Sequence, residues 1–200
     1  GVEFANGNLG SGNDSVTAGM QLGHIYGNGG SDSITLDYSG TLADGRTASQ
    51  ISFGRSYDSN GRNQTVTLDD GTVITSAVNG FEHLNIIGTD GDDVIDGSAG
   101  SSGNGEAGNQ LFGGAGNDVL TGGAGADVLD GGLGDDIFNK VGVGDIVVGD
   151  EGIDTVNFDL SSATENLVFN LVGNEGFGAS WTGVEFANGN LGSGNDSVTA

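Results

Sequence analysis

Three consecutive nine-residue segments decide the fold of this chain: GGAGNDVLT at 113–121, GGAGADVLD at 122–130 and GGLGDDIFN at 131–139. Each segment keeps an aspartate at its sixth position and an apolar residue at its eighth. A strand of about three residues followed by a six-residue glycine-rich turn makes half a coil, so two segments complete one coil of a flattened solenoid. We therefore expect an all-β fold, a parallel β-roll (β-solenoid), in which residues 18 apart stack on one another.

The same frame continues on both sides of these segments. It runs on through 140–148 and 149–157, and it begins at 104–112 with Asn109 at the sixth position. Further units occupy 9–17, 27–35 and 88–96, while the unit at 18–26 has Gly23 where aspartate is expected. The eighth position is apolar in all of them and is the predicted core position: Val16, Ile25, Ile34, Ile95, Leu111, Leu120, Leu129, Phe138, Val147 and Val156.

The sixth-position residues point to a metal. Stacked strands lie roughly 4.8 Å apart, and two carboxylates at about that spacing repel by roughly 3 kcal/mol at an effective dielectric constant near 20. Aspartate also favours turns without any ion, but a run of in-phase aspartates would then lack charge compensation. Calcium takes six to eight oxygen ligands in flexible geometry, and carboxylates with turn carbonyls provide them. The predicted metal ligands are Asp14, Asp32, Asp93, Asn109, Asp118, Asp127, Asp136, Asp145, Asp154 and Asp196.

Pairs of these residues 18 apart set the expected number of ions. They are Asn109/Asp127, Asp127/Asp145, Asp118/Asp136, Asp136/Asp154 and Asp14/Asp32, which predicts about four or five Ca2+ ions. Asn109 is expected to weaken its site, and Gly23 removes a ligand from the short block. Asp93 and Asp196 have no certain partner 18 residues away.

The nine-residue pattern G-G-x-G-x-D-x-U-x resembles the calcium-binding repeat of RTX (repeats-in-toxin, hemolysin-type) proteins, over about half of the chain. The resemblance implies a secreted bacterial protein, exported through type I secretion, that folds when calcium binds outside the cell. It also implies a location in the extracellular space or on the cell surface, where calcium reaches the concentrations that such modules need.

Composition excludes several partners. The 200 residues hold 42 glycines, no proline and no cysteine, and 28 acidic side chains outnumber four basic ones for a net charge of −24. Such a surface repels nucleic acid and anionic membranes, and no apolar run reaches the roughly 20 residues of a membrane span. Cations are the natural partners.

A longer repeat organises the chain. Residues 1–18 recur unchanged at 183–200, so the period is 182 residues, which indicates a tandem array whose neighbouring copies are further partners. Asp69-Asp70-Gly71 lies between two β-rich runs and predicts a hairpin. The expected organisation is a short β-roll block at 1–35, a connecting segment with the hairpin at 36–87, the main β-roll block at 88–157, a second connecting segment at 158–190, and the start of the next unit at 191–200.

A weaker duplication joins the two halves of the period. DTVNFDLS at 154–161 parallels DSITLDYS at 32–39, and each is followed later by a strand that begins with a Gly-x-Glu motif. The recurrence of this motif favours a structural or auxiliary calcium role for its glutamates, Glu3, Glu82 and Glu185.

No catalytic constellation is evident, so we expect the chain not to be an enzyme. H-E-x-x-H and G-x-S-x-G motifs are absent, and His24 and His83 are predicted to lie on strand surfaces. The leading hypothesis is a structural module of a large secreted protein such as an adhesin. The alternative is a carbohydrate-binding accessory module of a polysaccharide-acting enzyme, in which extracellular glycans would contact Trp181, otherwise a core plug, and the basic segment with Arg46, Arg55, Tyr57 and Arg62.

Overall fold

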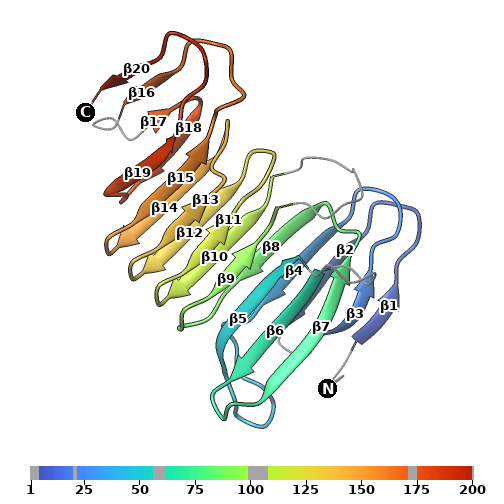
Figure 1. Ribbon diagram of the computed structural model, residues 1–200. Helices are drawn as coiled ribbons and strands as arrows, with labels where there is room; N and C mark the ends of the chain where they lie inside the picture. The colour runs from blue at the N-terminus through green and yellow to red at the C-terminus, as the bar shows by residue number, and fades with distance from the viewer. Residues whose placement is uncertain (1–4, 20–21, 56–61, 99–107, 171–174, 200) are drawn as a thin grey trace.

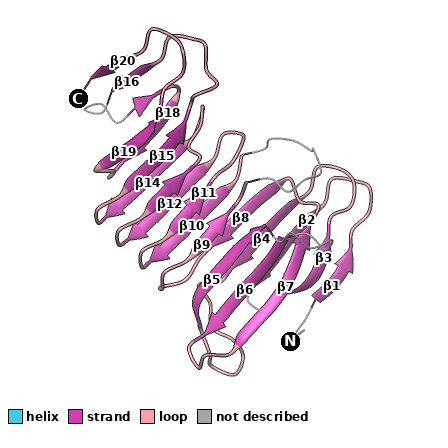
Figure 2. Cartoon of the chain, viewed as in Figure 1, coloured by secondary structure: helices cyan, strands magenta, loops and turns pink. Residues whose placement is uncertain are grey.

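The chain folds as two long β-sheets wound into a roll. The computed structural model describes residues 5–19, 22–55, 62–98, 108–170 and 175–199, which hold twenty strands and no helix. Figures 1 and 2 show the strands lying side by side along the molecule like rungs, with the N-terminal strands at one end and the C-terminal strands at the other. The expected all-β class with parallel strands is confirmed. No helix in the described part is long and apolar enough to cross a membrane.

The first sheet contains ten strands, of which five follow one another in parallel at its C-terminal end. Its order is β1 (Ala5–Asn8), β3 (Leu22–Tyr26), β7 (Val73–Asn79), β6 (Arg62–Leu68), β5 (Ala48–Arg55), β9 (Val94–Asp96), β11 (Val119–Thr121), β13 (Ile137–Asn139), β15 (Thr155–Asp159) and β19 (Phe186–Asn190).

The second sheet also contains ten strands, and the chain alternates between the two sheets through the repeat block. Its order is β2 (Ser15–Gly19), β4 (Ser33–Asp37), β8 (His83–Ile87), β10 (Gln110–Ala115), β12 (Val128–Leu133), β14 (Ile146–Glu151), β18 (Ala179–Thr182), β17 (Glu175–Gly176), β16 (Val168–Asn170) and β20 (Ser197–Thr199).

The register between parallel strands is 18 residues throughout the regular block, residues 108–157. Leu120 on β11 lies beside Phe138 on β13, and Leu129 on β12 lies beside Val147 on β14. This register follows from the nine-residue period, because two periods make one coil. The predicted stacking of residues 18 apart is confirmed for these strands.

A single file of apolar side chains from each sheet fills the interior. In the second sheet the file runs through Ile86, Leu111, Leu129 and Val147 to Trp181, all buried. Each buried aliphatic side chain contributes about 1.5–3 kcal/mol, so the thin core is sufficient only because it continues from coil to coil. The predicted core positions are buried, except that Val16 near the N-terminal end is half-buried.

Each sheet is interrupted once by antiparallel strands. In the first sheet β5, β6 and β7 form an antiparallel run, with Thr67 beside Val73 across the predicted hairpin turn, which is confirmed. In the second sheet β16, β17 and β18 form a shorter run. After each excursion the chain returns beside the strand it left, because β8 pairs with β4 and β19 pairs with β15. The second half of the period therefore repeats the first with the two sheets exchanged.

Candidate metal centre

The sixth-position residues form two columns, each directly preceding the strands of one sheet. In the first sheet Asp93, Asp118, Asp136 and Asp154 precede β9, β11, β13 and β15. In the second sheet Asp14, Asp32, Asn109, Asp127 and Asp145 precede β2, β4, β10, β12 and β14. Asp14 is half-buried, and the other eight side chains are at most 5% exposed. A buried column of carboxylates without cationic partners is unfavourable unless something compensates its charge.

One oxygen of each carboxylate is held by the backbone of the preceding coil. The amide of Asp118 donates to Oδ1 of Asp136 at 2.7 Å, and the amide of Asp136 donates to Oδ1 of Asp154 at 2.8 Å. In the other column the amide of Asp127 donates to Oδ1 of Asp145 at 2.8 Å. These bonds form a ladder that holds Oδ1 of each of these carboxylates. Oδ2 of Asp145 also accepts from the amide of Gly142, whereas Oδ2 of Asp136 and of Asp154 has no hydrogen-bond partner among the described residues.

The second oxygen of several carboxylates is suited to bind a cation. Within the described part of the chain, Oδ2 has no hydrogen-bond partner although it is buried in Asp32, Asp118, Asp127, Asp136 and Asp154. A buried, unpaired charged oxygen costs several kcal/mol, and native proteins avoid it unless an ion satisfies it. Because the same oxygen is unpaired on successive coils, the arrangement is a regular property of the repeat. The donor set, hard carboxylate oxygens in flexible turns, fits calcium.

Burial also raises the pKa of these carboxyl groups. The pKa of Asp118 is raised to about 7, chiefly by desolvation and further by the nearby charges of Asp93 and Asp136. Desolvation likewise raises the pKa values of Asp136 and Asp145 to about 6. Without a cation the carboxylates of a column are desolvated and repel one another. Some of them therefore bind protons near neutral pH.

Glycine at the first position of a unit makes room for the carboxylate. A Cβ built on Gly113 would overlap Oδ2 of Asp118 and press on the carbonyl oxygen of Gly131 in the next coil. A Cβ on Gly88 would likewise meet Oδ2 of Asp93 and the carbonyl oxygen of Gly113. The missing side chain thus lets a carboxylate oxygen and a carbonyl oxygen from adjacent coils face the same small space.

Backbone carbonyls are necessary for any metal site here. Among the described residues, no three acidic or histidine side chains gather closely enough to hold a metal ion by themselves. A site in either column therefore combines one or two carboxylates with turn carbonyls, as calcium tolerates and magnesium, which demands a tighter octahedron, does not.

The structure brings together all five pairs predicted from the spacing of 18 residues, since each pair is joined by an amide-to-carboxylate bond. It also supplies partners that the spacing did not give. The amide of Asp93 donates to Oδ1 of Asp118, 25 residues away, because the chain between them is longer than one coil. Oδ1 of Asp196 accepts from the amide of Leu167.

Asn109 differs from its neighbours in the column. Its side-chain amide donates to Oδ1 of Asp127 at 3.0 Å and makes longer bonds to the carbonyl oxygens of Gly97 and Gly122. Carboxylate and carbonyl oxygens are also what calcium binds, so the amide of Asn109 competes with an ion at this position.

One set of polar residues in the turns was not predicted from the sequence. Fifth-position side chains form a ladder of opposite sense, in which Oδ1 of Asn117 accepts from the amide of Asp135, and Oδ1 of Asp135 accepts from that of Ile153. The signal was present in the sequence, because the fifth position holds Asn or Asp in several units. Glu82 and Glu185 also take part, accepting hydrogen bonds from the amides of Asp32 and Asp154.

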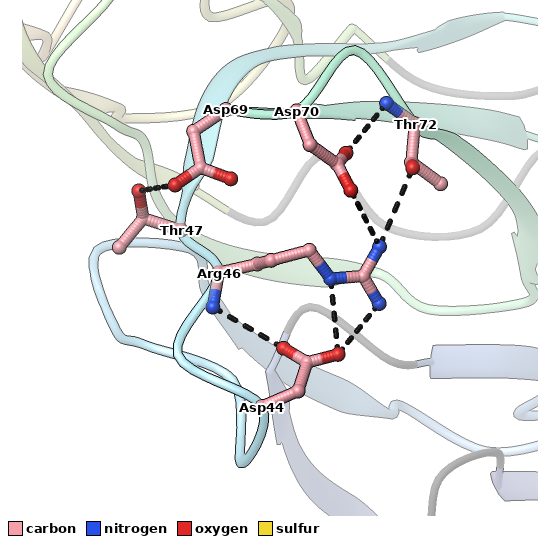
Figure 3. A network of polar contacts seen from close by, with 6 residues as sticks. All are labelled: Asp44, Arg46, Thr47, Asp69, Asp70 and Thr72. Atoms are coloured by element: carbon pink, nitrogen blue, oxygen red, sulfur yellow. Dashed lines mark hydrogen bonds and ion pairs between the residues drawn. The ribbon is translucent and has the colours of Figure 1, made fainter.

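The residues considered for glycan binding lie elsewhere. Arg46 is paired at 2.7 Å with Asp44 and at 3.3 Å with Asp70, and it also contacts Thr72 (Figure 3). Trp181 is 2% exposed and packs near Phe177, so the prediction of a core plug is confirmed. The side chains of Arg55 and Arg62, and residues Glu3 and Tyr57, lie outside the described part.

The two histidines occupy the predicted places. His24 on β3 and His83 on β8 are both exposed on strand surfaces. His83 contacts Ser31 through a side-chain hydrogen bond of 3.3 Å between Nε2 and Oγ.

The parallel roll and its columns of buried, half-satisfied carboxylates define a calcium-binding repeat module. A comparison with protein families matches residues 85–101 and 104–138 to the RTX calcium-binding nonapeptide repeat (4 copies). The match agrees with the resemblance predicted from the sequence, and the β-roll is the fold of such repeats. No curated protein matches the chain.

Proposed function

We propose that this chain is a structural module of a secreted or cell-surface protein, and that it folds and stiffens when calcium binds outside the cell. The observation that carries the proposal is the row of buried carboxylates whose second oxygen has no partner in the described part of the chain. The matched family supplies the identity of the ion, since its repeats bind calcium.

The proposed ligands are the residues of the two columns together with turn carbonyls. Five ions lie between the pairs joined across 18 residues, and the Asp93/Asp118 pair adds a sixth position. Asp196 is proposed to hold an ion with the turn that contains Leu167. When bound, calcium neutralises the carboxylates and ties adjacent coils together. The Asn109/Asp127 position is the weakest because the amide of Asn109 already donates to Asp127.

Folding and calcium binding are one equilibrium in this proposal. The chain's own residues hold each carboxylate in place by the amide ladder, but they leave its charge buried and uncompensated. Extracellular calcium modules bind at about 10⁻⁴–10⁻³ M, so such sites are empty in a cytosol and filled outside the cell. An export route that passes unfolded chains is compatible with this difference.

The test is a calcium titration of the purified chain, followed by circular dichroism and calorimetry. We expect little β signal in EGTA, and a cooperative rise in the millimolar range of CaCl2 with several ions bound. The same β content in EGTA as in millimolar calcium would contradict the proposal.

Asp136 offers a sharper test of the ligand assignment, because it belongs to the pairs on both of its sides. The variant Asp136→Asn keeps the acceptor for the amide of Asp118 but removes the charge. We expect it to lose one or two bound ions and to shift the calcium midpoint upward at least about tenfold, a cost of about 1.4 kcal/mol or more. The matched control Asp69→Asn, in the exposed hairpin turn, should leave both quantities unchanged.

Neighbouring copies of the 182-residue unit are proposed to continue the same roll. The identical segments at the two ends of the chain use opposite edges: Ser15 of β2 pairs forward with Ser33, whereas its copy Ser197 of β20 pairs backward with Val168. A coil with both edges paired would join one unit to the next. Small-angle scattering of a two-unit protein in calcium should show a rod about twice as long, and a bent or compact particle would exclude this arrangement.

A further inference from the structure

The glutamates of the two Gly-x-Glu motifs occupy places in the aspartate columns. Glu82 directly precedes β8, whose His83 lies beside Ser33, the residue that follows Asp32. Glu185 directly precedes β19, whose Phe186 lies beside Thr155, the residue that follows Asp154. Each glutamate therefore has the register that the aspartate of a next regular coil would have, although the intervening chain is 50 or 31 residues long instead of 18.

The hydrogen bond of the ladder is preserved at both places. The amide of Asp32 donates to Oε2 of Glu82 at 2.8 Å, and the amide of Asp154 donates to Oε2 of Glu185 at 2.8 Å. These match the bond from Asp136 to Asp154 in donor, acceptor type and length. One oxygen of each glutamate is thus held as in an aspartate of the column.

The space that a first-position glycine leaves for the carboxylate is preserved as well. A Cβ built on Gly149 would overlap the carbonyl oxygen of Gly183 and meet Oδ2 of Asp154, and one on Gly27 would meet Gly80 and Asp32 in the same way. This is the arrangement found at Gly113 in the regular block, so Gly80 and Gly183 take the place of a first-position glycine. Both adopt the left-handed conformation, with φ of 71° and 66°.

The side-chain length explains why these positions hold glutamate. In a regular unit four residues lie between the first glycine and the aspartate, whereas in Gly183-Val184-Glu185 only one does. The additional methylene of glutamate extends the reach of the carboxylate from this shorter turn.

An unsatisfied atom points to a ligand at each place. Oδ2 of Asp32 and of Asp154 is buried and has no hydrogen-bond partner within the described residues, and both residues are 0% exposed. In each case this oxygen and the carbonyl oxygen of the glycine in the Gly-x-Glu turn face the same space that a Cβ would fill. Asp37 and Asp159, exposed carboxylates that close turns with Ser39 and Ser161, show no such arrangement.

We propose that Glu82 with Asp32, and Glu185 with Asp154, complete two further calcium sites. The inference rests on the proposed function, since it extends the same columns by one site in each half of the period. Each site consists of one aspartate, one glutamate and turn carbonyls, and it takes a divalent cation of the size of calcium.

These sites have a role that the regular ones do not. The chain leaves the second sheet after β4 and returns to it at β8, and it leaves the first sheet after β15 and returns to it at β19. Each glutamate is the first acidic residue after the return, so a shared ion clamps the two ends of an excursion together. Closing a long loop in this way offsets part of its entropy cost and sets the register in which the following strand pairs.

The experiment counts the ions bound to the whole chain in CaCl2 by native mass spectrometry. Glu82→Gln and Glu185→Gln keep an oxygen that accepts from the aspartate amide but remove the charge. We expect each variant to bind one ion fewer than the original chain, and the double variant two fewer. The matched control Asp37→Asn removes an exposed carboxylate that closes a turn with Ser39 outside the columns, and it should leave the count unchanged.

The outcomes separate this inference from the proposed function. If the original chain binds calcium and Asp136→Asn loses ions, while both glutamine variants keep the full count and midpoint, the glutamate sites are excluded and the proposed function stands. If the original chain binds no calcium, the proposed function itself fails. Circular dichroism at saturating calcium verifies that each variant is folded, and the two variants, in different halves of the period, test the inference independently.

Discussion

The regular block at 108–157 and the β5–β7 segment (residues 48–55 and 62–79) differ in how their strands pair and in which residues they bury. Strands β11 and β13 of the regular block have three residues each and stack in parallel, with buried aspartates at their entrances. The β5–β7 strands have seven or eight residues, pair antiparallel, and bury Ile51, Phe53, Val66 and Leu68.

The roll therefore contains two regions that are stabilised in different ways. The buried polar side chains of the β5–β7 segment carry no charge: Gln64 donates a hydrogen bond to Ser76, although its own Oε1 has no partner among the described residues. The ion pair of Arg46 lies at the exposed surface. The regular block buries charges that no protein group neutralises within the described residues. The stability of the β5–β7 segment should depend little on calcium, and that of the regular block should depend on it strongly.

Removal of calcium should give the largest difference between the two regions. We expect hydrogen exchange in EGTA to lose nearly all amide protection in β10 to β15, because the columns then repel. Protection in β5 to β7 should fall at least about tenfold less, a difference of about 1.4 kcal/mol. Exchange measured by mass spectrometry with and without calcium decides this, and equal loss in both regions would abolish the distinction.

A methyl group added to a first-position glycine should have the next largest effect on stability. In Gly131→Ala the new Cβ would overlap Oδ2 of Asp136, so we expect a loss of about 3 kcal/mol in calcium. The matched variant Gly142→Ala meets only Oδ2 of Asp145 at 3.9 Å, an ordinary contact, and should cost less than about 0.5 kcal/mol. Chemical denaturation of both variants at saturating calcium measures the contrast, and similar losses would refute the steric explanation.

Acid should partly replace calcium in the regular block. The folded-state pKa is raised to about 7 for Asp118 and to about 6 for Asp136 and Asp145, while the unfolded value is near 3.8. Their contribution to stability is therefore fully present below about pH 4 and is lost as the pH rises through 6 to 7. Calcium-free chain should show more β signal at pH 5 than at pH 7.5.

The calcium-bound chain should respond in the opposite direction. Ligand carboxylates must be deprotonated, so calcium affinity should fall as the pH is lowered from 7.5 to 5. Circular dichroism in calcium-depleted buffers, beside titrations at both pH values, checks the two signs. A calcium-free β signal that grows with pH would show that burial of the aspartates is not the cause.

The smallest effect is expected in the β5–β7 region. Hydrogen bonding to the Arg46 guanidinium lowers the pKa of Asp44, and Arg46 also pairs with Asp70, but all three are surface groups. Arg46→Ala should lower the melting temperature by only a few degrees, because exposed ion pairs contribute little. The calcium midpoint should not change. A shift in the midpoint, followed by circular dichroism, would mean that the two regions are coupled.

Most of the candidate site could be predicted from the nine-residue period. The period sets the 18-residue stacking, and therefore the pairs Asp118/Asp136 and Asp127/Asp145, without any knowledge of long-range contacts. The recurrence of the Gly-x-Glu motif predicted a structural or auxiliary calcium role for its glutamates but not their partners, because no local spacing connects Glu185 to Asp154. Their partnership depends on where an excursion of variable length returns, which is a property of the whole roll.

The sequence by itself determined the coil: its nine-residue period, its buried eighth position and its ion-binding chemistry, because these depend on residues within nine or eighteen of one another. The predicted strands of about three residues are found in the first sheet, as in β11 and β13, whereas β10, β12 and β14 of the second sheet have six residues each. Only the tertiary structure decided how the irregular segments enter the two sheets, that Asp93 meets Asp118 across 25 residues, and that the two halves exchange sheets. These features arise from the closure of long loops, and strand pairing across such loops is selected by packing in the finished roll rather than by local preference.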